Sequence, residues 1–137
     1  MRGVKLSRML RGTPAGAGGV CGCQLWVRRG LKLQVNRVLA ASPRLLAVEC
    51  GLSAAQANVL VVVARVPVED ADEDVKSAFW EELGGVCAKT GMAGPSVILC
   101  IDACARTCAD APNAGAEEPN VVNDNGMRFM SFLRLHE

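Results

Sequence analysis

One apolar run constrains the fold of this chain more than any other feature. Residues 58–66 are largely apolar and rich in valine, and Pro67 follows them directly. A β-branched run of this length, bounded by a proline, is typical of a strand that is buried on both faces of a sheet. We therefore predict a central strand at residues 58–66.

An amphipathic helix and another strand are predicted after this run. Acidic residues crowd positions 69–74, and the apolar residues that follow are spaced four, four, three and one apart: Val75, Phe79, Leu83, Val86 and Cys87. This spacing predicts a helix over residues 72–89, with acidic side chains at its positive end. Residues 96–101 then predict a second central strand, which ends at Asp102.

The remaining segments extend the same pattern. Alternation or apolar runs predict strands at residues 20–27, 31–39 and 45–50, and residues 107–120 are predicted as a surface loop. Asn123 or Asp124 can cap a last helix through about Leu135, with one side formed by Met127, Met130 and either Leu133 or Arg134. Strands that alternate with helices indicate the α/β class.

Length and charge suggest one domain with a basic front. The 137 residues, half of them apolar, are enough for a single core at residues 20–137. Residues 1–19 are basic and rich in glycine, which fits a disordered arm, a transit peptide or the ragged start of a fragment. Residues 1–48 hold nine Lys and Arg and no acid, whereas residues 49–137 hold six against fourteen acids. A basic face beside an acidic pocket suits a polyanion bound through a metal, although a solvated basic tail gives the same count.

Cysteine usage and hydropathy bear on the compartment. The seven cysteines are odd in number and most lie in apolar runs, which favours free thiols and an intracellular setting, nuclear or cytoplasmic. Cys100, Cys104 and Cys108 are four residues apart, but the one histidine, His136, is remote, so a zinc or iron-sulfur site has little support. No run of eighteen apolar residues occurs, which argues against a membrane span.

Asp102 is the candidate site residue that the pattern itself indicates. Side chains just beyond the carboxyl ends of central strands converge on a crevice in α/β sheets. A carboxylate at the end of an apolar strand is costly unless it is paired, hydrated or bound to a metal. Asp102 therefore either takes part in a site or caps the turn that follows it.

The order of several segments resembles the endonuclease/exonuclease/phosphatase superfamily, and above all the endonuclease domains of non-LTR retrotransposons. The matching segments are a Gly-rich entry to Gln-Leu-Trp-Val at 24–27, Ser-Pro-Arg-Leu-Leu-Ala-Val at 42–48, Val-Val-Val-Ala-Arg-Val-Pro at 61–67, Lys-Ser-Ala-Phe-Trp-Glu-Glu-Leu at 76–83, Ser-Val-Ile-Leu-Cys-Ile-Asp-Ala-Cys-Ala-Arg at 96–106 and Asn-Asp-Asn-Gly at 123–126. The resemblance implies a partial four-layer α/β sandwich, in which mixed β-sheets are flanked by helices.

The resemblance also implies a chemistry, namely phosphodiester cleavage in DNA with a divalent metal, Mg²⁺. Asp102 matches the aspartate of the family's Asp-x-Asn-Ala motif, which helps to position or deprotonate the attacking water. Cys104 stands where the family has Asn, and Arg65 stands where relatives carry Tyr or His. Arginine can hold a phosphate but cannot act as an acid. The family's metal-binding Glu has no counterpart in the matching segments, so the metal ligands are unknown.

Other matched positions are expected to be structural. His136 is predicted as the surface end of the last helix rather than the family's catalytic histidine. Asn125 and Gly126 match a recurrent Asn-Gly, for which a cap and turn is the simpler interpretation.

Two functions follow from the sequence, and whether the chain is an enzyme stays open. The first is an ancestral metal-dependent phosphodiesterase or endonuclease, incomplete and weakly active or inactive as this chain. The second is a non-catalytic remnant that binds nucleic acid or a partner, or a gene-model fragment. An incomplete sandwich would leave sheet edges and an apolar face uncovered, so self-association is a further expectation.

Overall fold

A computed structural model describes residues 6–11, 22–28, 33–52, 57–89, 95–107 and 121–136. Its elements in chain order are β1 (Leu6–Arg11), β2 (Gln24–Arg28), β3 (Leu33–Ala41), β4 (Leu45–Leu52), β5 (Ala57–Arg65), α1 (Glu73–Ala88), β6 (Ser96–Asp102) and α2 (Asp124–Leu135). The α/β class is confirmed. Residues 6–11, inside the segment expected to be disordered, form β1. The rest of that segment and most of the loop predicted at 107–120 lie outside the described residues.

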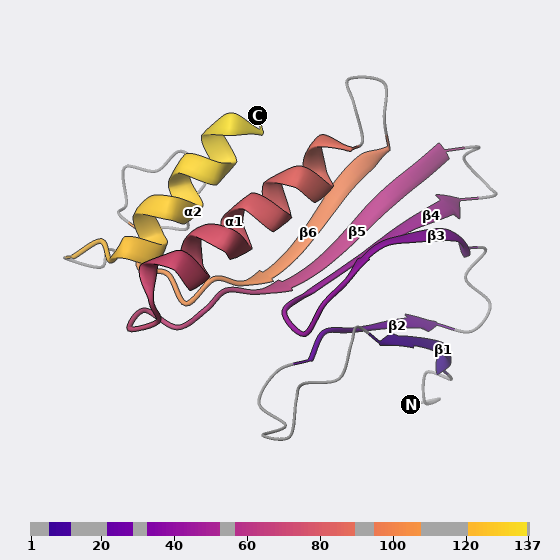
Figure 1. The fold of residues 1–137 in the computed structure, drawn as a ribbon. Helices are drawn as coiled ribbons and strands as arrows, with labels where there is room; N and C mark the ends of the chain where they lie inside the picture. Colours follow the sequence, from indigo (N-terminus) through magenta and orange to yellow (C-terminus); the bar gives the residue numbers. More distant parts are fainter. Residues whose placement is uncertain are drawn as a thin grey trace, which may run out of the picture. The chain divides into compact units, whose positions relative to one another are not determined.

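The chain divides into two compact units. The first comprises residues 1–65 and 88–101, and the second comprises residues 66–87 and 102–137. The first unit contains an antiparallel pair, β1 and β2, and a four-stranded sheet in the order β3-β4-β5-β6 (Figure 1). In the four-stranded sheet, β3, β4 and β5 pair antiparallel in sequence.

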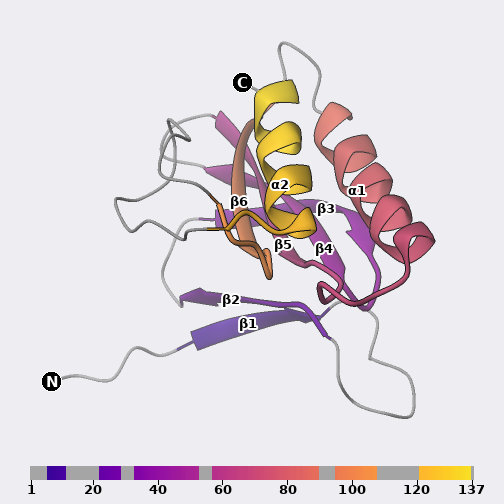
Figure 2. The same ribbon diagram turned by 90° about the vertical axis from the view of Figure 1, so that its left-hand side faces the viewer.

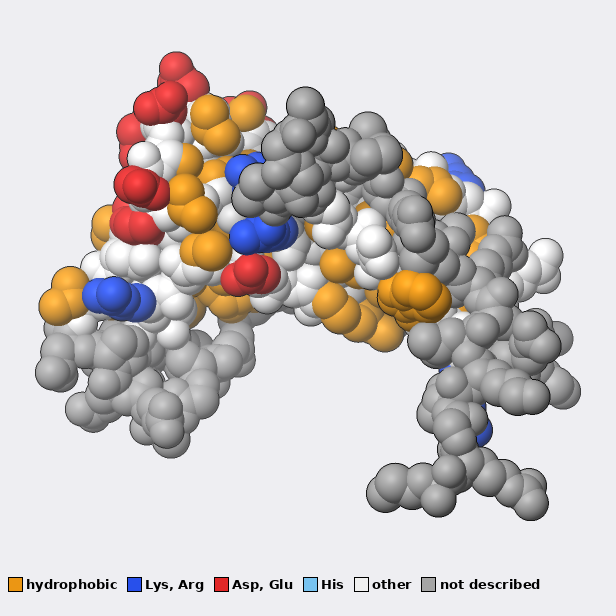
Figure 3. All heavy atoms as spheres, turned by 90° about the horizontal axis from the view of Figure 1, so that it is seen from below, with side chains coloured by type: hydrophobic (Ala, Val, Ile, Leu, Met, Phe, Trp, Pro, Cys, Tyr) orange, Lys and Arg blue, Asp and Glu red, His pale blue; other side chains and the backbone are white. Residues whose placement is uncertain are grey.

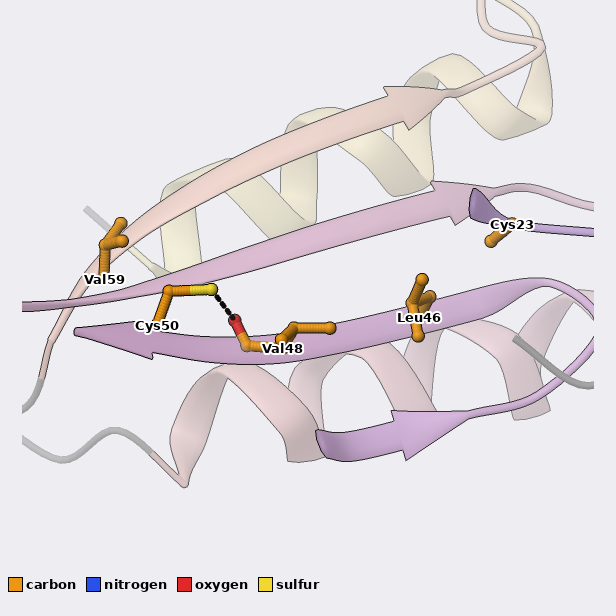
Figure 4. Close-up of a cluster of buried hydrophobic side chains, with 5 residues drawn as sticks. All are labelled: Cys23, Leu46, Val48, Cys50 and Val59. Carbon is orange, nitrogen blue, oxygen red and sulfur yellow. Dashed lines mark hydrogen bonds between the residues drawn. The ribbon is translucent and has the colours of Figure 1, made fainter. Parts of the chain in front are cut away.

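The core of the first unit lies on β4 and β5. The two strands pair from Leu45 with Ala64 to Leu52 with Ala57, and Leu60 and Val62 are fully buried. Three buried side chains of β4 also pack with Val59 of β5 and with Cys23, which precedes β2. Figure 4 shows this cluster, formed by Cys23, Leu46, Val48, Cys50 and Val59. The Cys50 thiol donates to the Val48 carbonyl oxygen at 3.9 Å. The prediction of a buried, central strand at 58–66 is confirmed.

The prediction of a second central strand at 96–101 is wrong. Among the described strands, β6 is the last in the sheet and has β5 as its one neighbour. Val97 is 43% exposed and Ile98 is 51% exposed. An apolar sequence indicates that a segment tends to form a strand and to pack, but it does not indicate how many strands lie beside it.

The second unit is built on α1 and α2, which lie side by side (Figure 2). The Trp80 ring of α1 lies 5.6 Å from the Phe132 ring of α2 and 6.3 Å from that of Phe129. The Phe132 ring in turn lies 4.5 Å from that of His136. Aromatic stacking of this kind adds to the apolar contact between the two helices.

The buried faces of the two helices differ in part from those predicted. On α1, the predicted positions from Phe79 onward are buried, but at the start of the helix Lys76 is buried and Val75 is 46% exposed. On α2, Phe132 is buried and Met127 is 57% exposed. Periodicity marks apolar positions, but tertiary ion pairs and close backbone approach select which of them face inward. No helix in the described part of the chain is long and apolar enough to cross a membrane.

Candidate functional site at the end of β6

Asp102 ends β6 next to the end of β5. The Val66 amide donates to the Asp102 carbonyl oxygen at 2.9 Å, so β5 and β6 run parallel and end together (Figure 1). This confirms the strand-helix-strand arrangement predicted from the sequence. The Asp102 side chain is exposed, so water hydrates the carboxylate and the burial cost expected for it does not arise. The Cys104 thiol donates to the Asp102 Oδ1 at 3.8 Å.

The loop after Asp102 is held in a defined conformation. Cys104 has a φ of 47°, in the left-handed region that side chains other than glycine rarely adopt. Asn123 fastens this loop, because its Nδ2 donates to the Cys104 carbonyl oxygen at 3.1 Å and its Oδ1 accepts from the Arg106 amide at 2.7 Å. Surrounding hydrogen bonds of this kind are what allow an unfavourable φ to persist.

Asn123 is also the N-cap of α2. Its Oδ1 accepts from the Gly126 amide at 2.9 Å, as expected of a side chain that caps the first turn. The same oxygen therefore serves both the helix and the loop. The sequence identified Asn123 as a possible cap, but its second function depends on a residue seventeen positions away.

A carboxylate from the segment between β5 and α1 completes the start of α2. Glu69 accepts from the Asp124 amide at 2.8 Å and from the Asn125 amide at 3.1 Å, so a negative charge lies at the positive end of the helix. The buried Asn125 side chain donates to the Pro67 carbonyl oxygen at 2.9 Å. Asn125 thus ties α2 to the chain after β5, as a structural residue.

A network of ion pairs joins the starts of the two helices. The buried Lys76 ammonium lies 2.8 Å from carboxylate oxygens of both Glu73 and Asp124, and it donates to the Glu69 carbonyl oxygen at 3.2 Å. Arg128 bonds Asp124 at 2.8 Å and also pairs with Glu73. Neither Lys76 nor Glu69 was predicted as important. The signal available was a lysine within a run of acids, which fits a solvated face equally well.

These contacts shift pKa values in the directions that charge pairing dictates. Hydrogen bonds from Lys76 and Arg128 hold the pKa of Asp124 below its ordinary value. Hydrogen bonds to Asp124 and Glu73 raise the pKa of Lys76, against the opposing effect of burial. Asp124 and Lys76 are therefore both charged over the physiological pH range, and their opposite charges compensate one another.

Arg65, the residue that the resemblance suggests for phosphate binding, lies at the end of β5. The Arg65 amide donates to the Arg44 carbonyl oxygen at 2.9 Å, which brings two half-buried arginines to the same end of the four-stranded sheet. A pair of guanidinium groups is suited to phosphate oxygens. Arg44 was not predicted as a site residue, because only strand pairing brings it to Arg65.

Magnesium is usually held by one or two carboxylates together with waters and substrate phosphates. Asp102 supplies one carboxylate, and the Cys104 sulfur beside it is not the oxygen donor that Mg²⁺ selects. Over the described ranges, no group of three or more His, Cys, Asp and Glu side chains converges as a metal site.

His136 follows the last turn of α2 as its C-cap, is exposed and packs on Phe132, which confirms that it ends the helix at the surface. Of the cysteines in the described segments, Cys23, Cys50 and Cys87 are buried, and Cys100 and Cys104 are exposed.

Comparison with protein-family models, with curated proteins and with solved structures found no match to this chain.

Proposed function

We propose that this chain is a partial domain of the endonuclease/exonuclease/phosphatase type, which binds the phosphate backbone of DNA but does not hydrolyse it alone. The observation that carries the proposal is that β5 and β6 run parallel and end side by side, with Asp102 at the last position of β6. The resemblance expects its aspartate at this point of a strand-helix-strand unit.

The residues around Asp102 favour binding over hydrolysis. An Asn at position 104 would present an amide to a phosphate oxygen or to the nucleophile, whereas Cys104 directs a thiol at Asp102. An exposed carboxylate with a thiol beside it is a poorer ligand set for a hard cation than a carboxylate with a second oxygen donor. Mg²⁺, when bound, would supply a Lewis acid and a more acidic water. Asp102 would contribute its carboxylate to holding the ion.

Charge supports a polyanion as the partner. Among the residues whose side chains are described, the first unit holds one acid, Glu49, and these bases: Arg28, Arg37, Arg44, Arg65 and Lys89. Glu49 is engaged by Arg37, with the two charged groups 3.0 Å apart. A surface with this excess attracts the phosphate backbone without regard to base sequence.

A plasmid assay tests both parts of the proposal. Supercoiled plasmid incubated with the chain and Mg²⁺ at low salt should be retarded in a gel, and after protein removal it should show no nicked product. Asp102→Ala should give the same result. Nicking that Asp102→Ala abolishes would contradict the non-catalytic part, and plasmid that is not retarded would contradict DNA binding.

A further inference from the structure

The two edges of the four-stranded sheet differ in how they are protected. On the β3 edge, the pairing with β4 shifts register between Val35 and Arg37 and again between Val38 and Ala40. The same strand carries Arg37, whose guanidinium bonds Glu49 at 3.0 Å. Irregular register and charged side chains are the means by which natural proteins prevent edge strands from pairing with other chains.

The β6 edge has much less protection. Residues 96–101 carry no charge, and the first acid of the strand is Asp102 at its end. Val97 is 43% exposed and Ile98 is 51% exposed, and consecutive residues of a strand point to opposite faces. Among the described strands, β6 has a neighbour on one side only. An uncharged edge that is apolar on both faces is a template for another strand.

We infer that β6 pairs antiparallel with β6 of a second copy of this chain. Full overlap of the two strands centres the pair on Leu99, which then lies opposite itself. Val97 lies opposite Ile101, and Ile98 lies opposite Cys100, so apolar side chains meet across the whole interior of the pair.

Charge and pattern select a second copy rather than an unrelated strand. In this register each Asp102 lies opposite a Ser96, so the two carboxylates stand at opposite ends of the pair, roughly 20 Å apart. No like charges meet, and each face of one strand finds a matching apolar face on the other. The pairing uses neither Asp102 chemistry nor the arginines, so it does not depend on phosphate binding.

Sedimentation velocity at several concentrations tests the pairing. The wild-type chain should sediment as a dimer of the 14.4 kDa subunit, in a concentration-dependent equilibrium. Ile98→Lys should shift the dimer to monomer, with the dissociation constant raised at least about tenfold, because two ammonium groups enter the apolar pair. Val38→Lys is the matched control, since Val38 is a 49% exposed valine on the β3 edge and should leave the dimer intact. A wild-type monomer at all concentrations, or equal effects of the two lysines, would overturn the inference.

Disulfide formation gives a second test that does not depend on a disruptive variant. In a Cys100→Ser background, Leu99→Cys places a thiol opposite its own copy, and facing Cα atoms of roughly 4.5–5.5 Å separation suit a disulfide. Mild oxidation should give a covalent dimer whose 99–99 link is found by peptide mapping. Val38→Cys in the same background should give no 38–38 link. Absence of the 99–99 link, or equal amounts of both links, would contradict pairing through β6.

Discussion

Gly126 lies where the first turn of α2 passes close to the loop after β6. A Cβ atom at this position would lie 2.0 Å from the Arg106 carbonyl oxygen and 3.0 Å from the Asn123 Oδ1. Both neighbours belong to the segments that Asn123 fastens together, so neither moves without weakening those hydrogen bonds. The absence of a side chain, rather than backbone freedom, is what this position requires.

Gly126→Ala should therefore lower the free energy of unfolding by about 2 to 3 kcal/mol, as overpacking against backbone does. Urea denaturation followed by circular dichroism measures the change. Gly85→Ala is the control, because Gly85 is also helical and a Cβ there meets nothing within 4 Å. The control should be neutral or raise stability by up to about 1 kcal/mol, since alanine favours the helix. Similar losses in both variants would show that close approach to Arg106 is not the cause.

At the scale of elements, the second unit depends on the contact between the N-terminal turns of α1 and α2. Lys76 comes from α1, Asp124 and Arg128 come from α2, and Glu69 comes from the segment before α1. The buried lysine is tolerated because its donors meet two carboxylates and a carbonyl oxygen. The network thus takes the place of the apolar contact that Val75 was predicted to make.

The network should make stability depend on pH at the acid side. The pKa of Asp124 is held below its ordinary value, so its ion pairs stabilise the fold above about pH 4, the pKa of an unfolded aspartate. This contribution is lost as the pH falls through the folded pKa. Wild type should melt at a higher temperature than Asp124→Asn at neutral pH, and the difference should shrink progressively below about pH 4.

Asp70→Asn is the control for that experiment, because it removes an exposed carboxylate from the same unit. Its melting temperature should follow that of wild type across the acid range. A gap between wild type and Asp124→Asn that does not change with pH would show that the ion pairs contribute nothing to this contact.

At the scale of the whole molecule, charge is divided between the two units. The first unit is basic in its described residues, whereas the second holds four bases, Lys76, Arg106, Arg128 and Arg134, against these acids: Glu69, Asp70, Asp72, Glu73, Asp74, Glu81, Glu82, Asp102 and Asp124. Figure 3 shows several acidic side chains gathered together on the face that it draws. DNA binding is thus expected through the first unit.

Removal of the two arginines at the sheet end should weaken DNA binding and reduce its dependence on salt. In the double variant Arg44→Ala and Arg65→Ala, the negative slope of log affinity against log salt should become less steep. The change should be about 1 for each phosphate that the variant no longer neutralises. Fluorescence anisotropy with a labelled duplex measures both quantities. Arg134→Ala, an exposed arginine of the acidic unit, should leave the slope unchanged. A slope that falls for Arg134→Ala and not for the double variant would place the DNA on the second unit.

Some elements follow from sequence pattern alone, because they depend on local forces. The run at residues 58–66 predicted β5, the acid-capped spacing predicted α1, and a cap at Asn123 or Asp124 predicted the start of α2. Each signal lies within one element, where hydrogen-bond geometry and solvent exposure set the residue pattern. The position of Asp102 at a strand end was predictable for the same reason.

The tertiary structure decided everything that depends on residues distant in sequence. Among the described strands it placed β6 at the edge of the sheet. It also buried Lys76 in place of Val75, and brought Arg44 to Arg65 and Asn123 to the loop after Asp102. Apolar character and charge are properties of a residue, but burial and pairing are properties of its neighbours. Asp102 was therefore recognisable from the sequence as the end of a strand, whereas its exposure and the hydrogen bonds from Asn123 to the loop after it were settled only by the tertiary structure.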